Sequence, residues 1–140
     1  MQTAPSSAHS TCTVRLEEAT DGAPGSFVLS VPGTEYMLNL VAGGPTSIAI
    51  GKRVTGTLSG RAQKLHRAQA GGEFIEPVEG HPRIVQGRVR DTDPAANRLL
   101  LQAVVPIWIT LSTDQSARDF HAGDIVNFYM ESGVVFTPHA

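Results

Sequence analysis

Alternation of apolar and polar residues, broken every few positions by glycine or proline, is the feature that most constrains how this chain folds. Residues 53–59 and 124–131 each turn every second side chain to one face. The residues on those two faces are Val54, Gly56, Leu58, Val126, Phe128 and Met130. Such period-two patterns are typical of half-buried antiparallel strands. Since 14 Gly and 9 Pro punctuate 140 residues, the strands must be short, and the fold class is all-β.

Helical spacing of apolar residues is rare along the chain. The best candidate is residues 112–121, STDQSARDFH, with Asp114 near its start and Gly123 just beyond its end. These signals predict one or two helical turns and no long helix.

A shift of 72 positions brings one half of the chain onto the other. The Thr-Asp pair at 20–21 then falls on the pair at 92–93, and Gly51 falls on Gly123. After a one-residue gap at the first hairpin, Tyr36, Leu38 and Leu40 are expected to match Ile107, Ile109 and Leu111. Chance similarity between two β-hairpins is the alternative. The preserved phase favours duplication, because a slip of one residue would turn every apolar side chain to water.

Two such units predict small antiparallel β-barrels of the OB, SH3 or PilZ-like class, built from two degenerate internal repeats. We expect a flexible N-terminal tail at 1–11, a first repeat at 12–71, a linker strand or loop at 72–83 and a second repeat at 84–140. The repeats form either two barrels side by side or one compact pseudo-twofold domain. Pro32 and Gly33 suit the centre of a type II turn in the first hairpin.

The alternation also predicts which side chains form the core. We expect ten of them to be buried: Phe27, Leu29, Leu38, Leu40, Leu58, Leu101, Ile109, Leu111, Val126 and Phe128. Met37 and Trp108 lie on the opposite faces of their strands. We interpret that second face as a contact between repeats or between subunits, and an exposed Met and a core Trp are the alternative.

Composition and motifs assign no catalytic residue, no metal ligand and no cofactor. The net charge is −2, Cys12 is the only cysteine, and the five histidines are scattered singly. No nucleophile elbow or phosphate-binding loop is present. The cluster of Glu73, Glu76, Glu79 and His81 is interpreted as a solvated linker strand rather than a metal site. Without a membrane-length apolar run or a secretory signal, the expected location is the cytoplasm, away from membranes.

Charge is segregated in one segment of the chain. Residues 52–67 carry no acid and five basic residues: Lys52, Arg53, Arg61, Lys64 and Arg67. These five form the candidate ligand-binding site, because such a segment can hold the phosphates of a nucleotide or nucleic acid. The segment has no aromatic residue on which a base could stack. The alternative is an edge strand whose charges prevent aggregation.

The order of residues in 61–130 resembles that of PilZ-type barrels, in which arginines precede a D-x-S-x-x-G motif. Arg61 and Arg67 precede RVRDTDPAANRL, which contains Asp91. The resemblance implies a barrel that binds a cyclic dinucleotide. Asp93 stands in place of the serine and Ala96 in place of the glycine, and a carboxylate there repels a phosphate.

Two classes of function follow. The first is a non-catalytic β-barrel module for binding or assembly, with a protein partner or a second copy favoured over a nucleotide or nucleic acid. The second is an enzyme whose site is assembled from loops without a local motif. A deep pocket with convergent polar side chains would favour the enzyme, and a flat apolar or basic face would favour the module.

Overall fold

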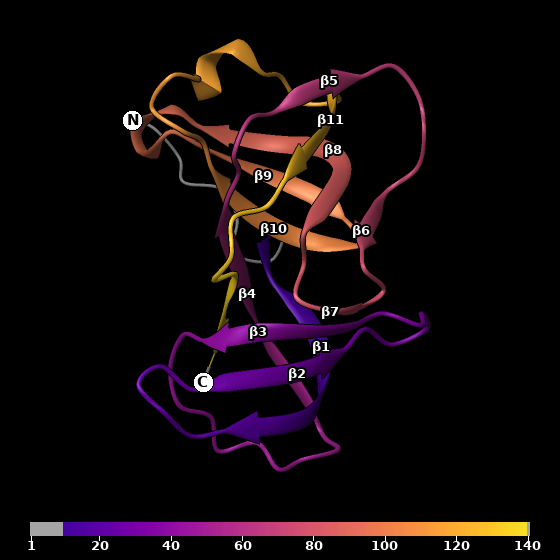
Figure 1. Cartoon of the computed structure of the whole chain (residues 1–140), viewed down its shortest axis with the longest axis vertical. Helices are drawn as coiled ribbons and strands as arrows, with labels where there is room; N and C mark the ends of the chain where they lie inside the picture. Colours follow the sequence, from indigo (N-terminus) through magenta and orange to yellow (C-terminus); the bar gives the residue numbers. More distant parts are fainter. Residues whose placement is uncertain (1–9, 140) are drawn as a thin grey trace.

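The computed structural model describes residues 10–139, which form an all-β fold with two single turns of 3-10 helix. The elements in chain order are β1 (Cys12–Thr20), β2 (Ser26–Ser30), β3 (Met37–Ala42), β4 (Arg53–Arg61), β5 (His66–Ala68), β6 (Phe74–Glu76), β7 (Glu79–Gly80), β8 (Ile84–Asp93), η1 (Pro94–Ala96), β9 (Arg98–Ala103), β10 (Val105–Thr110), η2 (Ala117–Asp119), β11 (Ile125–Tyr129) and β12 (Val135–Pro138). Figure 1 shows two lobes stacked along the long axis, with β4 running from one into the other.

The first lobe is a closed barrel of five strands. Its order is β1, β2, β3, β12 and β4, and the barrel closes because β4 also pairs with β1. β12 lies between β3, to which it is parallel, and β4, to which it is antiparallel. The last strand of the chain therefore completes the barrel that its first strand begins.

The second lobe uses the far end of β4. There β10 pairs with β4 in parallel, and the sheet continues through β9, β8 and β11 to β5. Between β4 and β5, Ala62 donates its backbone N–H to the carbonyl of Thr110 and bridges to Met130. These bonds join the two ends of the sheet, so the second lobe also closes on itself. The predicted all-β barrel class is confirmed.

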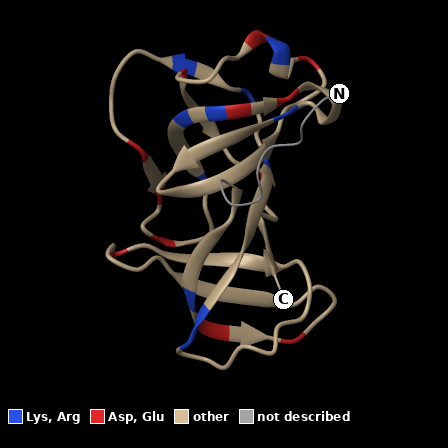
Figure 2. Ribbon diagram, turned by 180° about the vertical axis from the view of Figure 1, so that it is seen from behind, with Lys and Arg blue, Asp and Glu red and all other residues tan. Residues whose placement is uncertain are grey.

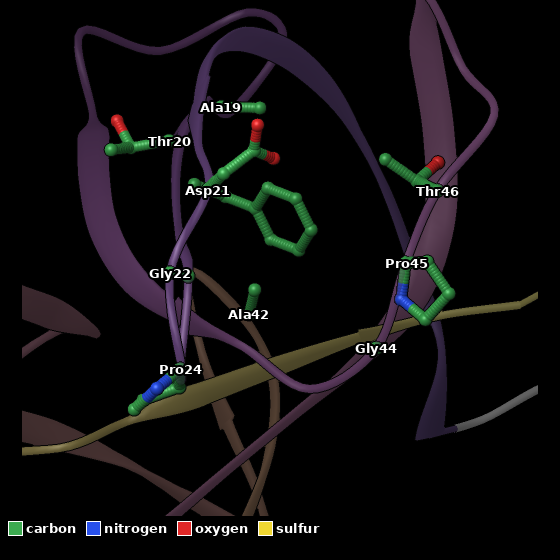
Figure 3. Close-up of a pocket in the computed structure, with 11 residues that line it drawn as sticks. Ala19, Thr20, Asp21, Gly22, Pro24, Ala42, Gly44, Pro45 and Thr46 are labelled. Carbon is green, nitrogen blue, oxygen red and sulfur yellow. The ribbon is translucent and has the colours of Figure 1, made fainter.

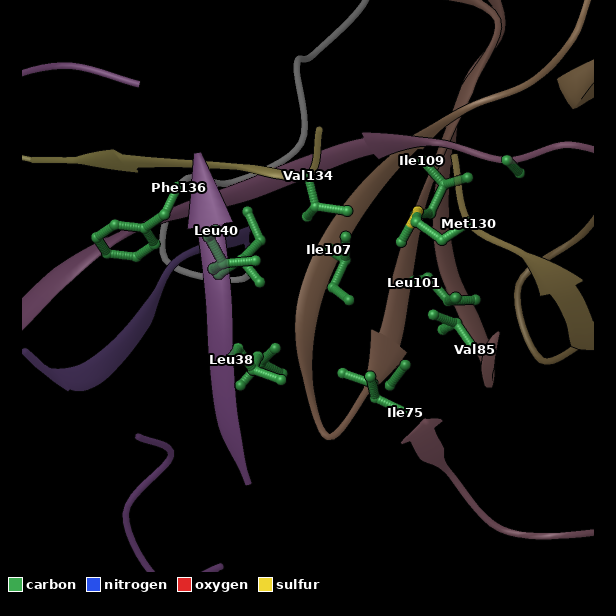
Figure 4. Packing of buried hydrophobic residues seen from close by; sticks show 14 of the residues in the cluster. Leu38, Leu40, Ile75, Val85, Leu101, Ile107, Ile109, Met130, Val134 and Phe136 are labelled. Carbon is green, nitrogen blue, oxygen red and sulfur yellow. The ribbon is translucent and has the colours of Figure 1, made fainter. Parts of the chain in front are cut away.

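One hydrophobic core runs through both lobes (Figure 4). All ten side chains predicted for the core are buried, and none is more than 5% exposed. Phe27 and Phe136 meet edge to face, with ring centroids 6.1 Å apart. β12 therefore closes the first barrel with packing as well as with backbone hydrogen bonds.

The two lobes share several details of backbone pairing. Gly51 donates to the carbonyl of Leu16, and Gly123 donates to the carbonyl of Val89, both with positive φ. Each of those two strands also has an irregularity at the same place, between Leu16 and Glu18 and between Val89 and Asp91. Descent from one duplicated unit stays a prediction.

The predicted match between the two hairpins is wrong by two residues. Leu29 pairs with Leu38 in the first lobe, and Leu101 pairs with Ile107 in the second. The shift of 72 positions places Leu29 on Leu101, so their pairing partners correspond as well. Leu38 therefore corresponds to Ile107 rather than to Ile109. The reason is the turn: six residues separate β2 from β3, whereas Val104 alone, at φ 68°, separates β9 from β10.

The structure assigns secondary structure to several other predicted segments. The linker at 72–83 supplies a short strand to each lobe, since β6 pairs with β8 and β7 pairs with β3. The helix candidate is the single turn η2. Gly33 has φ 79°, and Thr34 donates to the carbonyl of Val31, as a type II turn requires. Most of the predicted tail lies outside the described residues, and Ser10 is buried.

Candidate functional site

The five basic residues predicted to bind a ligand do not form one cluster. Arg53 begins β4 and Arg61 ends it, so roughly 26 Å of extended strand separates them. Lys52 lies beside Arg53 in the first lobe, and Lys64 and Arg67 follow Arg61 in the second. Figure 2 shows basic residues at both ends of the molecule rather than on one face. A single phosphate-binding patch made of all five residues is therefore not present.

Arg67 is engaged within the protein. Its guanidinium lies over the ring of Phe120, 4.7 Å from the centroid, and donates to the backbone carbonyl of Asp119. Its Nε is 3.6 Å from a carboxylate oxygen of Asp124. These contacts tie β5 to the loop that carries η2, so the side chain holds one end of the second lobe together.

Lys64 and Arg61 are exposed. Lys64 lies in the field of Asp114, whose carboxylate accepts a hydrogen bond from the Ser112 hydroxyl. That bond, the backbone amide of Asp114 and the charge of Lys64 hold the pKa of Asp114 below its ordinary value. Of the five predicted residues, only Arg61 and Lys64 remain available to bind a ligand in the second lobe.

The two predicted interface residues do not occupy matching positions. Trp108 is 6% exposed, and the Arg98 guanidinium lies 4.0 Å from the centroid of its ring. Asp93 fixes that arginine, with an oxygen 3.0 Å from its Nε. Met37 is half-buried, and its N–H donates to the carbonyl of Val78. Trp108 is thus already covered by its own chain, and an interface role for the two residues stays a prediction.

A cavity lies at the mouth of the first barrel (Figure 3). It has a volume of about 440 Å³ and lies between the β1–β2 turn and the loop after β3. Asp21 is its only charged lining residue, and half of its other lining residues are exposed. One carboxylate in an open hollow provides no partner for acid–base or nucleophilic catalysis.

A smaller hollow lies on the outer face of the second lobe, where sequence reasoning placed no site. β8 pairs with β6 on one edge and with β11 on the other, so Glu76, Ile84 and Tyr129 stand in a row across three strands. Directly opposed side chains lie about 5 Å apart at Cβ. With Pro77 and Arg83, the row lines a hollow of about 290 Å³. We call these five residues the outer groove.

The outer groove presents apolar surface to solvent. Tyr129 is 62% exposed, and Val78, adjacent to Pro77, is 45% exposed. Tyr129 has the highest exposure among the large hydrophobic residues that the structure describes as exposed. Exposed tyrosine and arginine beside aliphatic surface are typical of contact sites between proteins.

The charges of the outer groove are free within the described part of the chain. Neither Glu76 nor Arg83 forms an ion pair or a side-chain hydrogen bond with another residue of 10–139, although the N–H of Arg83 donates to the carbonyl of Glu76. The phenol of Tyr129 likewise has no hydrogen-bond partner in that range. The carboxylate of Glu76, the guanidinium of Arg83 and the phenol of Tyr129 are thus available to an external partner.

One sequence signal pointed to this groove. Tyr129 is a bulky aromatic residue on the polar face of an alternating strand, where exposure has to be explained. Glu76 and Arg83 gave no signal, because the pairing of β8 with β11 that brings Tyr129 beside them links segments far apart in the chain.

The described residues offer no metal-binding cluster and no membrane-spanning helix. Between residues 10 and 139, no three His, Cys, Asp or Glu side chains converge so that they could hold a metal ion. No helix in that range is long and apolar enough to cross a membrane. Comparison of the chain with protein-family models, with curated proteins and with solved structures gave no significant match.

Proposed function

We propose that this chain is a non-catalytic binding module of the cytoplasm that docks a protein partner through the outer groove. The observation that carries the proposal is the exposed Tyr129, which lines the same hollow as Glu76 and Arg83, two charges without an ion pair among residues 10–139. Aromatic and arginine anchors around a hollow, with polar groups at its rim, are the usual composition of an energetic hot spot. The small net charge disfavours a polyanionic partner.

A catalytic function receives less support. The cavity at the mouth of the first barrel is lined by one carboxylate, that of Asp21, and by no second titratable group that could act with it. Cys12, the only thiol, has its pKa raised to about 11 by burial, which is opposite to the activation that a nucleophile needs. An enzyme with a loop-assembled site is therefore the weaker alternative.

A random-peptide library displayed on phage tests the docking proposal. Peptides selected on the wild-type chain are measured on Tyr129→Thr and on Thr57→Ala, a control in the first lobe. We expect Tyr129→Thr to weaken binding about tenfold or more, as loss of a hot-spot aromatic does, while the control binds like the wild type. Peptides that bind both variants equally well would show that the outer groove is not the docking site.

A second candidate is single-stranded nucleic acid. Gln63 donates its N–H to the carbonyl of Tyr129, so β11 places an exposed aromatic beside the basic residues Arg61 and Lys64. The aromatic that the basic segment lacks is thereby supplied by another strand, and bases stack on such rings. Glu76 and Glu131 are exposed in the same region, and their negative charges weaken the local positive charge. Oligonucleotide binding that falls steeply with salt and is lost in Lys64→Gln would favour this candidate.

A further inference from the structure

The outer groove combines an exposed aromatic side chain with a hollow. Tyr129 stands 62% exposed at the edge of a hollow of about 290 Å³ that its own ring helps to line. A projecting ring and a hollow on the same surface can be exchanged between two copies related by a twofold axis. Each copy then offers one ring and receives one, which is the defining property of an isologous contact.

The outer groove is complementary to itself in charge. Glu76 and Arg83 line the same hollow, neither has an ion-pair partner among the described residues, and their backbones are joined by a hydrogen bond. A twofold axis between them brings Glu76 of each copy to Arg83 of the other. One such contact is necessarily accompanied by its symmetric equivalent.

We propose that the partner docked in the outer groove is a second copy of this chain, held in an isologous dimer by two reciprocal Glu76–Arg83 ion pairs around the Tyr129 rings. This inference rests on the proposed docking function and specifies its occupant. A net charge of −2 permits the contact, because proteins near neutrality repel their own copies weakly.

Charge exchange between two variants tests the pairing directly. In Glu76→Arg, both reciprocal contacts of a homodimer become Arg against Arg, and in Arg83→Glu both become Glu against Glu. Each variant alone should associate about tenfold or more weakly than the wild type, because like charges are then opposed. When the two variants are mixed, every contact is again Arg against Glu, and heterodimers should form.

Analytical ultracentrifugation from micromolar to millimolar concentration, with native mass spectrometry of the mixture, provides the readout. Circular dichroism confirms that each variant is folded, as the exposure of both side chains leads us to expect. A wild-type chain that stays monomeric throughout would overturn the dimer. If library peptides nevertheless need Tyr129 for binding, only the identity of the partner is wrong and the docking function stands. A mixture that associates no better than its separate components would exclude the reciprocal ion pairs.

Discussion

The two lobes share several details of backbone pairing but differ at their ends. In the first lobe, the mouth of the barrel is an open cavity of about 440 Å³ beside Asp21. In the second, the loop after β10 folds over the end, and Arg67 and Phe120 hold it in place. Pairing depends on alternation within strands, whereas the ends depend on the loops that join them. A shared architecture therefore leaves each lobe free to carry a different surface.

The outer faces differ as clearly as the ends. Asn39 pairs with Val28 in the first lobe at the place where Trp108 pairs with Leu100 in the second. Along the next strand, Tyr129 in the second lobe stands where the first lobe has Thr57, whose hydroxyl is 2.8 Å from the His139 ring nitrogen. At these two positions the second lobe carries an aromatic side chain where the first lobe carries a polar one. The proposed function is assigned to that lobe for this reason.

The shared core should give the largest effect. Phe128→Ala removes a ring that is 1% exposed and should lower the free energy of unfolding by about 3–5 kcal/mol. Urea unfolding followed by circular dichroism and by the fluorescence of the single Trp measures this loss. Tyr129→Ala, one residue along the strand, is the matched control and should cost far less. A loss below about 1 kcal/mol for Phe128→Ala would mean that the strand faces water.

The closed end of the second lobe should give an intermediate effect. The Asn97 side chain donates to the carbonyls of Ser112 and Gln115 and accepts from the N–H of Ala117, which holds the loop down. Asn97→Gly keeps the left-handed conformation at φ 51° but loses these bonds. We expect the free energy of unfolding to fall by about 1–3 kcal/mol, since buried polar groups lose their partners.

Faster amide hydrogen exchange confined to residues 111–121 would identify the loop as the origin of that loss. Exchange that increases equally in the first lobe would contradict the assignment of Asn97 to the closed end.

Substitutions of the basic residues in the second lobe should differ in their effect on stability, according to the contacts that each side chain makes. Arg67→Gln loses the contact with Phe120 and the pairing with Asp124, and should cost about 0.5–1 kcal/mol because the site is partly exposed. Arg61→Gln, whose side chain is exposed and unpaired within the described residues, should change stability by less than about 0.5 kcal/mol. Equal effects in thermal unfolding would remove the structural role given to Arg67.

Ionisation of the Cys12 thiol should have the smallest effect on stability, and none at neutral pH. It pairs with Gly56 in the first lobe, where the second lobe pairs Val85 with Phe128, and burial raises its pKa from the ordinary 9.0 to about 11. The folded thiol keeps its proton while the unfolded one loses it, so stability falls as pH rises from 9.0 to about 11 and is unaffected below that range. Alkylation should be slow in the folded protein and fast in urea. Equal rates in both would contradict this burial.

Much of the fold could be predicted from alternation alone. The buried faces of β4 and β11 follow from Val54 and Val126 with their neighbours two residues away. The correspondence between the two hairpins could not be predicted, because the lengths of the two turns differ and turn length is independent of strand phase. The outer groove could not either. It depends on the pairing of β6 with β8, which joins Glu76 to Ile84 through a short segment interpreted as a linker.

The proposed docking surface rests on one difference between the lobes, Tyr129 against Thr57. Light scattering of the wild type, of Tyr129→Thr and of Thr57→Ala over a range of concentrations tests it most directly. We expect the average mass of the wild type and of Thr57→Ala to rise toward that of a dimer with concentration, while Tyr129→Thr stays a folded monomer. If Tyr129→Thr associates as strongly as the wild type, the outer groove is not the contact surface.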